Sequence, residues 1–141
     1  MAGWLIALIS GALMSLQGVF NTEVTKQTSI WVAAGWVQLT AFLTCVVLWL
    51  FGDRHAVSAI LSVRPWYLLL GGVMGAFITW TVIKSMALLK PALATLIIVV
   101  AQILVSYLVE LMGLFGVEKA GFEWKKVLGA GLAILGIFIF K

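Results

Sequence analysis

The stretch PALATLIIVVAQILVSYLVELMGL, residues 91–114, is apolar over the length of a membrane span yet carries Gln102, Ser106 and Glu110. As a helix rising about 1.5 Å per residue, it would cross a hydrocarbon core of about 30 Å. Gln102, Ser106 and Glu110 recur at every fourth position and would form one stripe on that helix. Gln102 would lie about 17 Å past Pro91, near the midplane, and Glu110 about 29 Å past it, near the far surface. A polar stripe is costly against lipid, so we expect Gln102 to be buried, whereas Glu110 could be buried or exposed.

Composition places the whole chain in a membrane. Of its 141 residues 64% are hydrophobic and 10% are charged, and its mean hydropathy is +1.19, whereas soluble domains are about 45–50% apolar. Charged residues separate long apolar runs, which predicts an all-α integral membrane protein with one transmembrane domain, residues 1–141. Its five predicted helices cover residues 2–22, 30–51, 66–89, 91–114 and 124–140. The last apolar run is short for a span and needs Trp124 at its start.

The remaining single features suggest no cleaved leader, no intrachain disulfide and no metal site. MAGWLIALISG, residues 1–11, has no basic region before its apolar run and no small-x-small cleavage site after one, so we expect a retained first helix. The one cysteine, Cys45, lies inside the second predicted helix, where we expect a buried thiol without a disulfide. The one histidine, His55, lies in a loop, residues 52–65, that we expect to be solvated at the membrane surface. We expect no metal and no cofactor.

Lysine and arginine are divided almost evenly between the two faces of a five-helix protein. The N-terminal face would hold Arg54, Arg64, Lys119, Lys125 and Lys126, and the opposite face Lys26, Lys84, Lys90 and Lys141. The difference in the number of lysines and arginines between the two faces largely sets the orientation of a membrane protein. Five against four is almost no difference, so the sequence does not choose an orientation. The chain could insert both ways and form an antiparallel homodimer, like the inverted repeats of transporters; alternatively, one extra charge resolves a weak bias. The charges form no basic stripe, which excludes nucleic acid as a partner.

Two further glutamines interrupt the first and second predicted helices. Gln17 would lie about 20 Å from the N-terminal face, and Gln38 about 12 Å from the opposite face. Asn21, one turn after Gln17, would lie near that opposite face. An amide without partners in hydrocarbon costs on the order of several kcal/mol. The glutamines would therefore either hydrogen-bond to neighbouring helices or line a cavity.

Trp80 lies far from the helix ends where tryptophan usually anchors a membrane helix. Trp31 and Trp49 bound the second predicted helix, as interfacial anchors do, whereas Trp80 would lie about 21 Å inside the membrane. Its ring could bind an organic cation, or it could pack against other helices with its N–H bonded to a threonine.

Small residues recur at helical spacing in two predicted helices. Gly71 and Gly75 lie on one face of the third helix, and Gly129, Ala133 and Gly136 on one face of the fifth. Small side chains let another helix approach closely. Both faces are therefore candidate dimer-packing surfaces.

Glu110 is the candidate for coupling transport to an ion. An ionisable residue in a membrane helix is a functional candidate by default, and this carboxylate could exchange a proton for a cationic substrate. The alternative is an ion pair with Arg54 or Arg64, which would lie on the same face.

Several segments resemble one family of membrane proteins. SMALLKPALATLIIVVAQ (residues 85–102), the following helix with Glu110 and GLFGVE, and KKVLGAGLAILGIFIF (residues 125–140) resemble the second half of a repeat unit in the drug/metabolite transporter superfamily. With SGALMSLQGVFN in the first helix and LLLGGVMGAF in the third, they are most similar to the short YdcZ-like family. The resemblance implies a five-helix protomer in a bacterial inner membrane, often of dual topology, acting as a homodimer or with a sister protein.

A more distant resemblance links the chain to the four-helix small multidrug exporters. In those proteins a glutamate within the first helix couples export to protons. Here that helix carries Gln17 in its interior and its acid, Glu23, at its end. Glu110 is then the remaining intramembrane coupling candidate.

Together these features favour a secondary transporter subunit that moves a small organic solute, with an organic cation as one candidate, by alternating access of an antiparallel dimer. Its candidate substrate-binding residues are Gln17, Gln38, Trp80, Gln102 and Ser106. The alternative is a non-transporting membrane subunit, a hetero-pair partner or a lipid-handling protein, with the polar residues joining helices. We expect no enzyme, because the sequence has no clustered membrane carboxylates and no phosphate-binding glycine loop.

Overall fold

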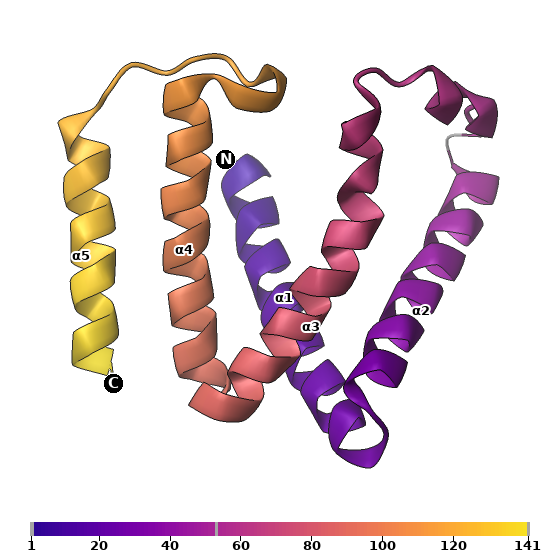
Figure 1. Cartoon of the computed structure of the whole chain (residues 1–141), viewed down its shortest axis with the longest axis horizontal. Coiled ribbons are helices and arrows are strands. Elements are labelled where there is room, and N and C mark those ends of the chain that lie inside the picture. The colour runs from indigo at the N-terminus through magenta and orange to yellow at the C-terminus, as the bar shows by residue number, and fades with distance from the viewer. Residues whose placement is uncertain (1, 53, 141) are drawn as a thin grey trace. The chain divides into compact units, whose positions relative to one another are not determined.

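The computed structural model describes residues 2–52 and 54–140, which are helical apart from short connections (Figure 1). The elements are α1 (Ala2–Gln27), α2 (Ile30–Phe51), η1 (Val57–Ser62), η2 (Trp66–Leu70), α3 (Gly71–Leu89), α4 (Pro91–Met112), η3 (Leu114–Gly116) and α5 (Trp124–Phe140). Four segments are long and apolar enough to span a membrane: α1, α2, η2 together with α3, and α4. With 17 residues, α5 lies at the short end of the range of about 17–25 that a span needs. The predicted all-α membrane class is confirmed, with four to five helices that could span.

The structure corrects several predicted boundaries. α1 continues to Gln27, and the break falls at Ser29, whose hydroxyl accepts a hydrogen bond from the N–H three residues later. α4 ends two residues earlier than predicted, because Gly113 takes a left-handed conformation with φ of 64° and caps it. The loop after α2 contains the 3₁₀ turns of η1. Cys45, expected to be buried, is exposed on α2 within the single chain.

The chain divides into two compact units, Met1–Ala87 and Leu88–Lys141. In the first unit α1 packs against α2, and α1 also approaches α3 at Gly18. A Cβ atom on Gly18 would lie 2.5 Å from Met86 Cε and 3.2 Å from Val82 Cγ1. A side chain at this position would therefore require Met86 and Val82 to shift. In the second unit α4 and α5 lie side by side (Figure 1).

Few side chains are buried in either unit. Small residues make up much of the interior, including Ala33, Ala34 and Ala94, as expected where helices must approach closely in lipid. Most large apolar side chains of the described residues face outward; Trp4 is 82% exposed and Phe51 is 86% exposed. This apolar surface is suited to a bilayer.

Candidate functional site

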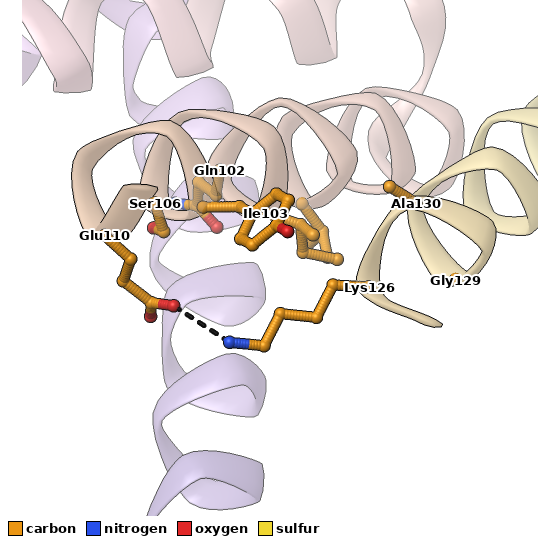
Figure 2. Close-up of a pocket in the computed structure, with 9 residues that line it drawn as sticks. Gln102, Ile103, Ser106, Glu110, Lys126, Gly129 and Ala130 are labelled. Atoms are coloured by element: carbon orange, nitrogen blue, oxygen red, sulfur yellow. Dashed lines mark hydrogen bonds and ion pairs between the residues drawn. The ribbon is translucent and has the colours of Figure 1, made fainter. Parts of the chain in front are cut away.

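A groove of about 470 Å³ lies between α4 and α5, within the second unit (Figure 2). It is lined by Val99, Gln102, Ile103, Ser106, Tyr107, Glu110, Lys126, Gly129 and Ala130. The predicted stripe of α4, Gln102, Ser106 and Glu110, lies entirely along it. Gln102 was expected to be buried, but its side chain is exposed to the groove in the single chain.

The turn after α4 brings the chain back toward the groove. The Glu110 carbonyl accepts hydrogen bonds from the Gly113 N–H at 3.3 Å and from the Ala120 N–H at 2.9 Å. A Cβ atom on Gly113 would lie 3.1 Å from Lys119 Cβ. The left-handed glycine therefore both ends α4 and leaves room for the returning chain.

Tyr107 fixes the start of α5 to α4. Its hydroxyl accepts a hydrogen bond from the Glu123 N–H at 2.9 Å and lies 3.3 Å from the Glu123 carbonyl, to which it donates. The same carbonyl accepts hydrogen bonds from the N–H groups of Lys126 and Val127, and these bonds begin α5. One phenol thus sets where the first turn of α5 meets α4.

Lys126 crosses the groove at this point. Its ammonium lies 3.2 Å from Glu110 Oε2, 3.1 Å from Glu123 Oε1 and 5.4 Å from the centre of the Tyr107 ring. Figure 2 shows the pair of Lys126 and Glu110 bridging the two helices. About two fifths of each of these two side chains is exposed (40% and 43%), so water can screen the pair.

This ion pair differs from the alternative considered for Glu110. The expected partners were Arg54 or Arg64. In the structure, Arg54 Nε donates to the Leu50 carbonyl at 2.6 Å, and Arg64 Nη1 donates to the carbonyls of Leu61 and Val63. The partner of Glu110 is Lys126 because the chain after α4 folds back within the same unit.

A second groove, of about 510 Å³, lies between α1 and α2 in the first unit. Gln17 lines it, together with Asn21, Trp36, Thr40 and Thr44 among others. Asn21, predicted to lie near the membrane surface, is only 8% exposed. Both threonine hydroxyls donate to carbonyls of their own helix. The groove is therefore mainly apolar, with the amides of Gln17 and Asn21 as its polar groups.

Gln38 and Trp80 lie elsewhere in the first unit. Gln38 Nε2 lies 2.9 Å from the place of a Cβ atom on Gly75, so this glycine makes room for a glutamine of the same chain. The Trp80 ring stacks on Trp31, with ring centres 6.2 Å apart and planes 14° apart. Trp31, predicted to be an interfacial anchor, is thus a packing partner of Trp80.

The other small residues proposed for dimer packing have open surroundings. Around Gly71, Gly129 and Gly136, a Cβ atom would meet no heavy atom within 4 Å. Ala133 is half-buried. In the described residues no three histidine, cysteine, aspartate or glutamate side chains gather as metal ligands.

Sequence reasoning missed Tyr107 and Lys126 as groove residues. Lys126 was counted only as a surface charge, although it shares a helical face with Gly129 and Ala130, three and four residues later. Tyr107 stands beside Ser106 in the sequence and lines the same groove. No local pattern signals its hydrogen bonds with Glu123, which depend on the fold of the intervening turn.

Comparison with known proteins places the chain in a family. No curated protein and no solved structure matches it. A family model described as "Putative inner membrane exporter, YdcZ" matches residues 2–139, nearly the whole chain. The resemblance seen in the sequence and the apolar helices of the structure agree with this match. The chain belongs to the YdcZ family of drug/metabolite transporters and is a multi-pass protein of the inner membrane.

Proposed function

We propose that the chain is the protomer of a secondary transporter that moves a small organic solute across the inner membrane by alternating access. The observation that carries this proposal is the α4/α5 groove, whose polar stripe runs from Gln102 through Ser106 to Glu110. From Gln102 to Glu110 the helix α4 rises about 12 Å. A solute could therefore exchange hydrogen bonds along α4 between the membrane surface and the midplane.

Gln102 and Ser106 are proposed to contact the solute in this groove, and Gln17 in the α1/α2 groove. Gln38 on α2 and Trp80 on α3 are also proposed to contact the solute, from the first unit. The amide and hydroxyl groups could bind a neutral or charged polar solute.

We further propose that two inverted copies form the working unit. The nearly even charge of the two faces would permit both orientations. The open glycine positions of α3 and α5 leave room for another helix. In such a dimer, the inward-open and outward-open states would be related by symmetry.

Glu110 is the proposed coupling residue. Its carboxylate lines the groove and bears an exposed ion pair, so it can change partner at low cost. Binding of a proton or a cation there would change the charge of the groove between the two end states.

The test is transport by the purified protein in liposomes under an imposed pH gradient. Radiolabelled tetraethylammonium, glucose and alanine serve as probe solutes. Glu110→Gln is expected to abolish the pH dependence of uptake. The matched control is Glu118→Gln, since Glu118 is an exposed glutamate of the loop before α5. An unchanged pH profile in Glu110→Gln would remove Glu110 from coupling, and no uptake of any probe would count against a transporter of such solutes.

A further inference from the structure

We infer that Lys126 occupies a binding site for a primary ammonium ligand with an aliphatic body, and that such a ligand displaces it. This inference rests on the proposed transport function and names the class of its substrate. The surroundings of the Lys126 ammonium carry it: one carboxylate oxygen from Glu110 on α4 at 3.2 Å, one from Glu123, the residue before α5, at 3.1 Å, and the Tyr107 ring at 5.4 Å. A ring face with adjacent carboxylates is a chemical environment that selects organic cations.

The shape of the groove fits the rest of such a ligand. Besides its polar residues, the groove between α4 and α5 is lined by Val99, Ile103, Gly129 and Ala130. These residues are apolar or small, and a Cβ atom on Gly129 would meet nothing within 4 Å. An alkyl chain could therefore lie in the groove while its ammonium group reaches Glu110. Lysine itself combines these two parts, which is why its side chain fills the site.

The arrangement also provides a way to release Lys126. Glu110 belongs to α4, whereas Glu123 directly precedes α5, three residues before Lys126. When a ligand takes Glu110, Lys126 keeps its ion pair with Glu123, so no ammonium is left unpaired. The exposure of all three side chains makes this exchange inexpensive. Lys126 is then a specificity-determining residue, since a ligand must carry a cation able to replace it.

The experiment measures binding of n-butylammonium to the full-length protein in detergent by isothermal titration calorimetry. 1-Butanol and butyrate serve as uncharged and oppositely charged probes of the same length. Lys126→Met removes the competing ammonium and keeps an unbranched side chain. It is expected to tighten n-butylammonium binding about three- to tenfold. Lys126→Arg is expected to weaken binding, because a guanidinium can hold a carboxylate through two hydrogen bonds.

The matched control is Lys125→Met, which removes the same charge one residue away and outside the groove lining. The inference is overturned if Lys126→Met binds n-butylammonium no more tightly than this control does. It is also overturned if 1-butanol binds as tightly as n-butylammonium. If Lys126→Met does not fold, Lys126→Arg still decides, since unchanged or tighter binding by that variant contradicts competition.

The proposed ammonium site and the proposed transport function can be refuted independently. Tighter binding in Lys126→Met without uptake of any solute in liposomes would leave the ammonium site standing and refute the transporter. Uptake by the wild type, together with n-butylammonium binding that Lys126→Met does not change, would support the transporter and refute the ammonium site.

Discussion

The rings of Trp31 and Trp80 stack with their centres 6.2 Å apart, joining the start of α2 to the middle of α3. This contact explains a tryptophan deep in an apolar helix without requiring a bound cation. It also shows that a tryptophan at a helix end can pack against another helix as well as anchor the helix at the interface.

The stack predicts energetic coupling between the two rings. Trp31→Leu and Trp80→Leu should each destabilise the first unit, and the double variant should lose about 0.5–1.5 kcal/mol less than the sum. The measurement is a double-mutant cycle on denaturant unfolding in detergent. Trp4→Leu combined with Trp80→Leu is the control and should be additive, because Trp4 is 82% exposed. Additivity in the Trp31 and Trp80 cycle would contradict the stack.

The stability of the first unit should depend on the size of the side chain at position 18. Gly18→Val places a branched side chain where Met86 and Val82 already lie, and we expect a loss of about 1–3 kcal/mol of unfolding free energy. Gly11→Val, on the same helix with no atom within 4 Å of a new Cβ, is the control. Equal losses in the two variants would show that helix propensity, and not the contact with α3, sets the effect.

Gly75 should tune the position of Gln38. Gly75→Ala would put a Cβ atom 2.9 Å from Gln38 Nε2, so the amide must move. If Gln38 contacts the solute, KM for transport should change about three- to tenfold, with a smaller effect on kcat. Gly72→Ala, whose surroundings are open, should leave KM unchanged. A KM equal to wild type in Gly75→Ala would exclude Gln38 from the binding site.

Tyr107 should hold the first turn of α5. Tyr107→Phe keeps the ring but removes both hydrogen bonds with Glu123. Amide exchange at Glu123 should become about three- to tenfold faster, because local opening of the turn no longer has to break these two hydrogen bonds. Hydrogen exchange followed by mass spectrometry reads this out, with the middle of α1 as internal reference. Unchanged exchange at Glu123 would mean that the bonds do not restrain the turn.

Orientation should be mixed. Reporters active on only one side of the membrane, fused after Lys141, should both give signal if five against four basic residues leaves no bias. Adding one lysine to the loop before α5 should then move most of the signal to one reporter. A single active reporter in the wild type would mean that the small bias decides, and would redirect the search to a sister subunit.

The sequence by itself determined the class of the protein, the approximate extent of its helices and the polar face of α4. These depend on local properties: apolar length against bilayer thickness, and the 3.6-residue period that aligns Gln102, Ser106 and Glu110. The family could also be recognised, because its segments extend over nearly the whole chain.

Only the tertiary structure decided which side chains meet. Within the second unit Glu110 pairs with Lys126, because Gly113 turns the chain and Tyr107 fixes where α5 begins. Trp80 met Trp31, and Gln38 met Gly75, across 49 and 37 residues of sequence. The physical reason is that helix periodicity fixes which residues share a face, whereas the turns and close approaches between helices fix what that face contacts.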